Sequence, residues 1–303
     1  MIPTGYAHLS ALLDHQLAVY PEHRRYLVKR FAGVSPEHLV LTDELAGHVL
    51  RIAGDQVRTV CEDYKWMVGW TLNEELFFRR NGRYRLSKFA DAYAEVYANT
   101  ELMTRYVNGI LASQIWWRNH TDVLGYFRDT FVAGNPGGFR HLEVGPGHGL
   151  FLYLAASSAS CASAEGWDVS PASIAATREA LARMGNRHKI DLMEVDIAKA
   201  PSRQFDSITF SEVLEHLEEP LAALKTLHGL LVKGGRIFVN APANSPMPDH
   251  LYLFRSPEEV VEMVRAAGFD VAGTMFAPPT GATLEQARRQ LLSVSAVVIG
   301  TKT

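Results

Sequence analysis

The amino-acid sequence predicts an α/β protein: a doubly wound, mostly parallel seven-stranded sheet in residues 136–303, preceded by an N-terminal helical domain in residues 1–135. Two observations carry this prediction. Apolar side chains recur at helical spacing through the first 130 or so residues. From residue 139 onward, short apolar runs alternate with helix-like stretches, which is the pattern of an open parallel sheet. The segment Asn135-Pro136-Gly137-Gly138 separates the two patterns and is typical of a linker.

The first half of the chain is expected to be helical throughout, apart from one segment. Helical faces are formed by Leu9, Leu12, Leu13 and Leu17 and by Met103, Val107, Ile110 and Leu111. Ser35-Pro36-Glu37 indicates a helix start, and we expect that helix to continue through Leu45, Val49, Ile52 and Val60. Asn81-Gly82 is a turn signal, and Arg83-Tyr84-Arg85-Leu86 after it predicts one short strand or wing.

Seven apolar runs after the linker predict the strands of the sheet. They are residues 139–144, 164–169, 190–195, 207–210, 236–240, 271–276 and 293–300. Helix-like stretches separate the first six, so the strands are expected to run mostly parallel, with helices on both faces of the sheet.

Composition excludes several classes of protein. The chain has a net charge of −3, with 47% hydrophobic and 21% charged residues, which is ordinary for a globular protein. Neither half has the basic surplus that nucleic-acid binding needs. No apolar run approaches the length of a membrane span, and the first residues lack the pattern of a secretory signal. The only two cysteines, Cys61 and Cys161, support no disulfide framework, and we expect a reducing cytoplasm.

The most informative motif follows the first expected strand and reads Glu143-Val-Gly145-Pro-Gly147-His-Gly149. Three glycines at alternate positions between a strand and a helix allow the backbone to approach a ligand closely. A dinucleotide-binding loop would need its third glycine at position 150, which is Leu150, and no Gly-Lys-Ser/Thr of a phosphate loop follows. The pattern therefore excludes these two kinds of nucleotide site.

The motif resembles motif I of class I S-adenosylmethionine-dependent methyltransferases, in which an acidic residue precedes Gly-x-Gly-x-Gly. The resemblance covers residues 139–303 and implies a Rossmann-like methyltransferase fold that binds S-adenosylmethionine. It implies that Glu143, Gly145, Gly147 and Gly149 contact this cofactor. Asp168 ends the second expected strand, where the family binds the ribose hydroxyls; a carboxylate suits them because it accepts both O–H groups.

Three further residues are assigned to the cofactor by the same resemblance. Asp196 ends the third expected strand, where the family's acid accepts the adenine amino group and the next side chain, here Ile197, packs on the ring. Ser211 ends the fourth, where family members meet the methionine moiety. Leu230-Leu-Val-Lys-Gly234-Gly-Arg-Ile-Phe-Val resembles the family's helix, Gly-Gly turn and fifth strand.

The segment after the fourth expected strand indicates the kind of acceptor. Members that methylate amino groups in DNA or protein carry Asn/Asp-Pro-Pro-Tyr here, and this chain does not. On a helix, Glu212, Glu215 and His216 would share one face. His250 follows the fifth expected strand, and loops after neighbouring strands face the same crevice, so His250 is expected to approach these residues. Two carboxylates and two imidazoles predict a candidate site for a divalent cation, Mg²⁺.

This Glu-x-x-Glu-His arrangement with a later histidine resembles ubiquinone-biosynthesis O-methyltransferases and small-RNA terminal ribose methyltransferases. The resemblance implies a metal that holds two acceptor oxygens and lowers the pKa of one. The RNA substrate is not implied, because this chain lacks a basic surface. Without a metal, His216 or His250 is the candidate catalytic base, since an imidazole titrates near neutral pH. His120 is a weaker candidate.

We therefore expect an S-adenosylmethionine-dependent methyltransferase acting on a small molecule of specialised metabolism, with O-methylation favoured over N- or C-methylation. The helical domain would shape the acceptor pocket and support a homodimer. Two alternatives stay open. The protein could bind the cofactor while catalysing a rearrangement or cyclisation, or the helical half could be a winged-helix-like module of a regulator. A closed pocket lined by Tyr106, Trp116 and Trp117 would exclude the regulator.

Overall fold

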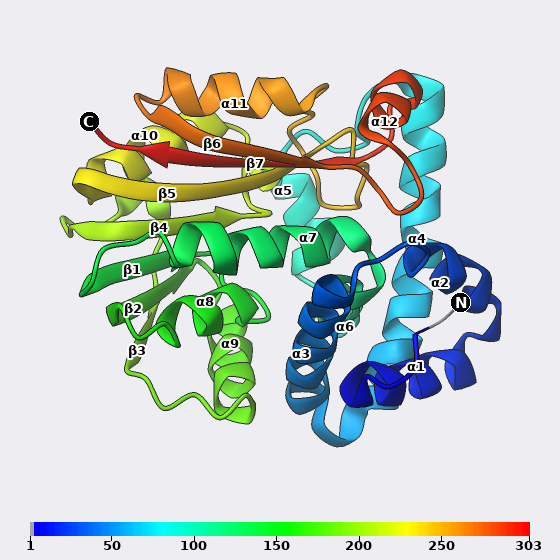
Figure 1. Ribbon diagram of the computed structural model, residues 1–303. Helices are drawn as coiled ribbons and strands as arrows, with labels where there is room; N and C mark the ends of the chain where they lie inside the picture. The colour runs from blue at the N-terminus through cyan, green and yellow to red at the C-terminus, as the bar shows by residue number, and fades with distance from the viewer. Residues whose placement is uncertain (1–2) are drawn as a thin grey trace.

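The computed structural model describes residues 3–303, and its centre is a seven-stranded sheet of order β3-β2-β1-β4-β5-β7-β6 (Figure 1). Strands β1 to β5 run parallel, and β7 is antiparallel to both β5 and β6. The predicted doubly wound, mostly parallel sheet is confirmed, and each predicted run falls in a strand, although Val169, Val195 and Ser293 at the ends of three runs lie just outside. The strands are β1 (Phe139–Val144), β2 (Cys161–Asp168), β3 (Ile190–Glu194), β4 (Phe205–Ser211), β5 (Leu231–Ala243), β6 (Asp270–Ala277) and β7 (Val294–Thr301).

The chain before the sheet is helical, as predicted. Its helices are α1 (Ala7–Val19), α2 (Arg24–Arg30), α3 (Pro36–Ala53), α4 (Val57–Asn81), α5 (Phe89–Ala92), α6 (Thr100–Trp116) and α7 (Arg118–Tyr126). Short 3₁₀ or π-helical turns connect some of them: η1 (Pro21–His23), η2 (Gly54–Gln56), η3 (Tyr93–Tyr97) and η4 (Phe127–Val132). Among residues 3–303, no helix is both long and apolar enough to cross a membrane.

Two predictions about this helical half are wrong. The helix that begins after Ser35 does not reach Val60, because Gly54 adopts a φ of 57° and ends α3. Val60 therefore belongs to α4. Residues 83–86 form no strand; the chain there is irregular between α4 and α5.

Helices cover both faces of the sheet. On one face, side chains such as Leu142 and Ile237 pack against α10 (Pro220–Leu230) and α11 (Pro257–Ala266). On the other face, Phe139 and Phe238 pack against α8 (Leu150–Ala156), α9 (Pro171–Arg183) and the turn η4. Neighbouring residues of one strand point to opposite faces, so Ile237 and Phe238 enter different cores. The remaining elements are η5 (Ile197–Lys199), η6 (Leu214–His216) and α12 (Leu284–Gln290).

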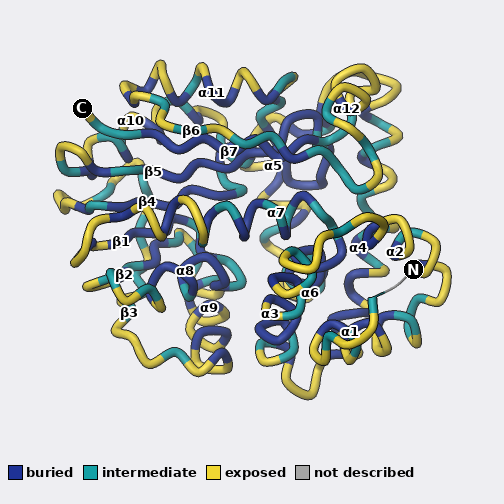
Figure 2. The backbone as a smooth tube through the Cα atoms, in the orientation of Figure 1, coloured by how far each residue is buried: buried dark blue, intermediate teal, exposed yellow. Residues whose placement is uncertain are grey.

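The helical half shares its core with the sheet. The ring of Phe127 in η4 lies 4.9 Å from that of Phe151 in α8 and 5.1 Å from that of Phe238 in β5. One continuous buried cluster runs from Leu9 in α1 to Ile299 in β7, seen as dark blue segments in both halves of Figure 2. The boundary at residue 135 stays a prediction, and α7 and η4, which precede it, pack on the sheet.

Phe127→Ala is expected to destabilise the whole chain, because the ring is fully buried where the two halves meet. Removing a buried phenylalanine ring costs about 3–5 kcal/mol of unfolding free energy. Urea unfolding followed by circular dichroism measures this loss. Phe89→Ala is the matched control, because Phe89 is 44% exposed and its loss is expected to cost under about 1 kcal/mol. Equal effects of the two substitutions would contradict the shared core.

Candidate active site

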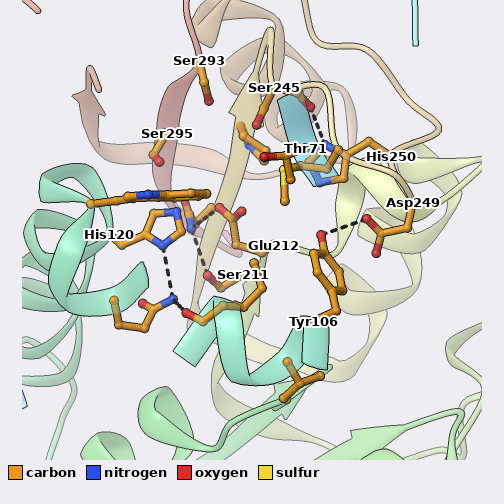
Figure 3. A pocket seen from close by; sticks show the side chains of 18 of the residues that line it. Thr71, Tyr106, His120, Ser211, Glu212, Ser245, Asp249, His250, Ser293 and Ser295 are labelled. Carbon is orange, nitrogen blue, oxygen red and sulfur yellow. Dashed lines mark hydrogen bonds between the residues drawn. The ribbon is translucent and has the colours of Figure 1, made fainter. Parts of the chain in front are cut away.

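A pocket of about 570 Å³ lies between the carboxyl ends of β1, β4 and β5 and helices α4, α6 and α7. The sheet contributes the loop after β1 and the segments after β4 and β5, and the helical half contributes apolar and aromatic side chains (Figure 3). Tyr106 and Trp117 line the pocket as expected, whereas Trp116 is fully buried in the core. The two halves of the chain thus enclose a cavity at the carboxyl ends of the strands, where open α/β proteins bind ligands.

The loop after β1 depends on its glycines. Gly145, Gly147 and Gly149 have φ angles of 72°, 49° and 75°, in the left-handed region that other residues rarely adopt. A Cβ atom on Gly145 would also lie only 2.8 Å from Cγ2 of Val213. Gly145 and Gly147 line the pocket, and Gly149 lies just outside it at the start of α8. The glycines therefore keep the backbone open to a ligand.

Glu143, at the end of β1, provides a buried carboxyl group beside this loop. Its side chain lines the pocket, and its Oε2 atom has no hydrogen-bond partner within residues 3–303. Burial raises the pKa of this carboxyl well above its ordinary value. A ligand that brings a positive charge here would stabilise the ionised form. The ammonium group of S-adenosylmethionine has that charge, so this part of the site fits the cofactor.

Asp168 and Asp196 lie at the carboxyl ends of the paired strands β2 and β3. Asp168 accepts hydrogen bonds of 2.8 Å from the Ser170 N–H and from the Ser173 hydroxyl, and burial raises its pKa. Asp196 is half-exposed and accepts a bond of 2.9 Å from Ala198 N–H, with Ile197 beside it. Asp168, Asp196 and Ile197 lie outside the lining of the pocket, whereas Ser173, which donates to Asp168, lines it.

The segment after β4 differs from the predicted helix. Glu212 adopts a φ of 53°, and only Leu214–His216 form a single 3₁₀ turn, η6. Glu212 donates its N–H to the carbonyl of Asn240 at 2.8 Å, and its Oε1 accepts from Asn240 Nδ2 at 2.8 Å. Burial raises the pKa of Glu212 to about 7. The prediction that Glu212 and Glu215 share a helical face with His216 is therefore wrong.

Glu215, His216 and His250 do come together. Each offers one ligand atom, and these atoms all lie within 4.8 Å of one another. Glu215 Oε1 is 3.8 Å from His216 Nε2 and 3.9 Å from His250 Nε2. Neither Glu215 carboxylate oxygen has a hydrogen-bond partner among the described residues, and the side chain is fully buried. Burial, reinforced by the negative charge of Glu212, raises the pKa of Glu215 well above its ordinary value.

Backbone carbonyls orient both imidazoles of this group. His250 Nδ1 lies 2.6 Å from the Ser245 carbonyl oxygen, and His216 Nδ1 lies 3.1 Å from the Asp249 carbonyl oxygen. A carbonyl only accepts, so both Nδ1 atoms carry the proton. Nε2 of each ring lies toward Glu215 and is the atom left to bind a ligand. The group thus offers two imidazole Nε2 atoms and a carboxylate without hydrogen-bond partners, and backbone carbonyls hold Nδ1 of each imidazole. This arrangement is typical of metal ligands.

No role for Asp249, Tyr97 or Asn240 was predicted from the sequence. Tyr97 and Tyr106 each donate a hydroxyl hydrogen bond of 3.0 Å to a different oxygen of Asp249. The Tyr97 hydroxyl also lies 3.2 Å from Nδ1 of His216. Side chains of η3 and α6 thus reach the histidine group. The one available signal was the position of Asp249 next to His250.

His120, the weaker candidate base, also lines the pocket. Its Nδ1 lies 3.0 Å from Ser113 Oγ and 3.2 Å from Gln114 Nε2, both in α6. Burial lowers the pKa of His120 to about 3. An imidazole with so low a pKa is a poor proton acceptor near neutral pH, so His120 is part of the pocket wall and not a base.

Comparison with known proteins agrees with this geometry. A family model described as "Methyltransferase domain" matches residues 116–289. The ubiquinone biosynthesis O-methyltransferase of Xanthomonas axonopodis pv. citri (strain 306) is 28% identical over 167 residues, which cover 47% of this chain and 69% of that protein. The protein of the same name from Neisseria meningitidis serogroup C (strain 053442) is 29% identical over 161 residues, which cover 45% of this chain and 66% of the relative.

Among solved structures, the S-adenosylmethionine-dependent methyltransferase SibL in its apo form is similar over 98% of both chains, with a TM-score of 0.56 and 16% sequence identity. That identity shows the fold alone, including the helical half. The family model, in contrast, covers more than half of this chain and contains the glycine loop and the histidine group. The chain therefore belongs to the methyltransferase domain family and is a class I S-adenosylmethionine-dependent methyltransferase.

Proposed function

We propose that this chain transfers the methyl group of S-adenosylmethionine to a hydroxyl oxygen of a small, partly apolar molecule. One observation carries the proposal: the group formed by Glu215, His216 and His250 lies at the same pocket as the glycine loop. Transfer needs the acceptor oxygen in line with the methyl group at about 3–3.5 Å, and it needs the acceptor's proton to be removed. Residues proposed for both tasks line this one pocket, which supports the proposal.

The cofactor is proposed to bind across the carboxyl ends of β1, β2, β3 and β4. Glu143 would pair with its ammonium group, and Asp168 would accept hydrogen bonds from its ribose hydroxyls. Asp196 would accept from the adenine amino group, with Ile197 packed on the ring and Ser211 near the methionine part. Val169, which follows Asp168, is 57% exposed and offers a further apolar surface to the ring. When bound, this cofactor supplies a methyl group on a positively charged sulfur.

A divalent cation is proposed to bind Glu215, His216 and His250. Two imidazoles and one carboxylate suit Mn²⁺, Fe²⁺, Co²⁺ or Zn²⁺, whereas Mg²⁺ prefers oxygen ligands, so the donor set argues against the expected Mg²⁺. Glu212, which the sequence placed among the ligands, is bound to Asn240 instead. The cation would lower the pKa of an acceptor hydroxyl. The carbonyls of Ser245 and Asp249 would hold the two imidazoles in place for it.

The acceptor is proposed to be small and partly apolar because of the other pocket walls. Helices α4 and α6 present an apolar surface made of Val68, Leu72, Met103, Val107 and Ile110. A pocket of this size and composition is typical of small-molecule sites. The names of the two curated relatives favour O-methylation. A role in specialised metabolism and the homodimer stay predictions; sedimentation tests the latter.

Asp168→Ala is expected to weaken S-adenosylhomocysteine binding by about tenfold to a hundredfold, because a charge-assisted hydrogen bond contributes roughly 1.5–3 kcal/mol. Isothermal titration calorimetry measures this affinity. Asp206→Ala is the control, because Asp206 pairs with Arg140 at the opposite end of the strands. This variant should bind S-adenosylhomocysteine with the affinity of the parent. Unchanged affinity in Asp168→Ala would remove Asp168 from the proposed site.

Mass spectrometry of the product tests the reaction itself. The protein, supplied with Mn²⁺, S-adenosylmethionine and a catechol, is expected to release S-adenosylhomocysteine and an O-methylated catechol in equal amounts. Methylation on carbon or nitrogen of suitable phenols and amines, with none on oxygen, would contradict O-methylation. Cofactor binding without S-adenosylhomocysteine release from any acceptor would favour a rearrangement or cyclisation.

A further inference from the structure

We infer that the pocket recognises a carbonyl or carboxylate group on the methyl acceptor, at the end away from Glu215, His216 and His250. This inference rests on the proposed function and adds the chemical class of the acceptor. The residues that carry it are Tyr26, Asn119, Thr280, Ser293 and Ser295, which all line the pocket and are here called the hydroxyl end.

The hydroxyl end is built from elements far apart in the sequence. Tyr26 lies in α2, Asn119 in α7, Thr280 and Ser293 in the connection between β6 and β7, and Ser295 in β7. Figure 3 shows Ser293 and Ser295 on the opposite side of the pocket from His250 and Asp249. None of the five side chains carries a charge at neutral pH.

Thr280 has a hydroxyl proton with no acceptor among the residues that the structure describes. Its Oγ1 accepts a hydrogen bond of 2.9 Å from the Tyr26 hydroxyl and one of 3.1 Å from the Arg118 N–H. A hydroxyl oxygen has two lone pairs, so both are occupied and only the proton remains. Within residues 3–303 no protein atom accepts that proton, and Thr280 is therefore available as a donor to a ligand.

Ser295 and Ser293 add two further donors. Ser295 Oγ accepts a bond of 3.0 Å from Asn119 Nδ2, and no group among the described residues accepts its proton. Ser293 makes no side-chain hydrogen bond there. The first turn of α7, which begins at Arg118, adds the partial positive charge of a helix start. Hydroxyl donors that converge on one end of a cavity are satisfied by a ligand oxygen that accepts several bonds, such as a carbonyl or carboxylate.

The opposite end of the pocket, near Glu215, His216 and His250, is lined by acidic side chains. Glu143 lies at the end of β1, and Glu212 and Asp249 follow β4 and β5. The remaining lining carboxylate among the described residues, Glu75, is paired with Arg79. No lysine or arginine lines the pocket within residues 3–303. An acceptor would therefore direct its reacting hydroxyl toward the histidine group and its carbonyl oxygen toward the hydroxyl end. The apolar walls of α4 and α6 would enclose its middle.

A matched set of catechols tests this inference. The probes are dihydrocaffeate, its carboxamide, and the propylcatechol with the same ring and chain length but no carbonyl. Calorimetry with protein saturated with S-adenosylhomocysteine is expected to give about tenfold tighter binding for the two carbonyl probes, since one or two hydrogen bonds contribute roughly 1–2 kcal/mol. Tighter binding of the acid than of the amide would identify a carboxylate; the reverse order would identify a neutral carbonyl.

Variants of the hydroxyl end complete the test. Ser295→Ala and Thr280→Val are expected to remove most of the preference for the carbonyl probes while leaving propylcatechol and S-adenosylhomocysteine affinities unchanged. Thr280→Ser keeps the hydroxyl and should keep the preference. Three results would overturn the inference. Propylcatechol could bind as tightly as the carbonyl probes, the preference could survive both variants, or none of the probes could bind. Failure of the proposed function would give a different result: the probes would bind with the expected preference, but none would be methylated.

Discussion

Replacing Glu215 with glutamine is expected to lower kcat/KM for methyl transfer by at least about a hundredfold, because even the loss of a group that only orients a metal ligand costs roughly 10–100-fold. Glutamine has nearly the same shape, so the packing around η6 is kept. The amide, however, carries no negative charge to offset a divalent cation between His216 and His250. Steady-state kinetics with saturating S-adenosylmethionine, together with metal analysis of the purified protein, measures both losses.

The controls separate this effect from unfolding. Glu219→Gln changes an exposed residue of the same segment and should leave turnover unchanged. Metal-free Glu215→Gln should be at least as stable as the metal-free parent, because the parent buries an unpaired carboxyl group there. His250→Ala and chelator treatment should each depress turnover to a similar degree, with no additive loss when combined. Full activity in excess chelator would contradict the metal and leave His216 as the candidate base, because burial lowers the pKa of His250 to about 3.

Gly145→Ala is expected to weaken S-adenosylhomocysteine binding by at least about a hundredfold. The left-handed backbone at this position costs an alanine roughly 1–2 kcal/mol. The added Cβ would also lie 2.8 Å from Cγ2 of Val213, so the loop must move away from the geometry that admits the ligand. Calorimetry measures the change in affinity directly.

Gly137→Ala is the matched control for this substitution. Gly137 lies in the loop before β1, its φ is not in the left-handed region, and a Cβ there meets no atom within 4 Å. Its affinity for S-adenosylhomocysteine should equal that of the parent. A Gly145→Ala protein that binds with parental affinity would show that the loop does not contact the cofactor.

The strands could be predicted because their physical cause is local. A parallel strand covered on both faces is a short apolar run, and each predicted run overlaps a strand of the sheet. The wing at residues 83–86 could not be judged in this way. Tyr84 and Leu86 are buried alternately with their neighbours, as in a strand, but they pack on the loop after β5: Tyr84 Oη accepts from Ser245 N–H at 2.9 Å. The alternating pattern therefore reflected the burial of these two side chains, but they pack against a loop and not against a neighbouring strand.

The site could be predicted in part for the same reason. Asp168 lies near the end of one predicted run and Asp196 follows the next, so their places at strand ends were visible in the sequence. The bend at Glu212 was not, because its left-handed backbone depends on Asn240 in the neighbouring strand. The bonds from Tyr97 and Tyr106 to Asp249 join residues 152 and 143 positions apart. Only the packing of the helical half on the sheet brings those partners together.

The most direct test of the whole account is a crystal structure of the protein with S-adenosylhomocysteine and Mn²⁺, with the anomalous signal of manganese recorded. We predict an anomalous peak bonded to Glu215, His216 and His250, and a cofactor sulfur that opens into the same pocket. A peak elsewhere or none at all, or a sulfur directed away from this group, would contradict the proposal that the glycine loop and the histidine group serve one reaction.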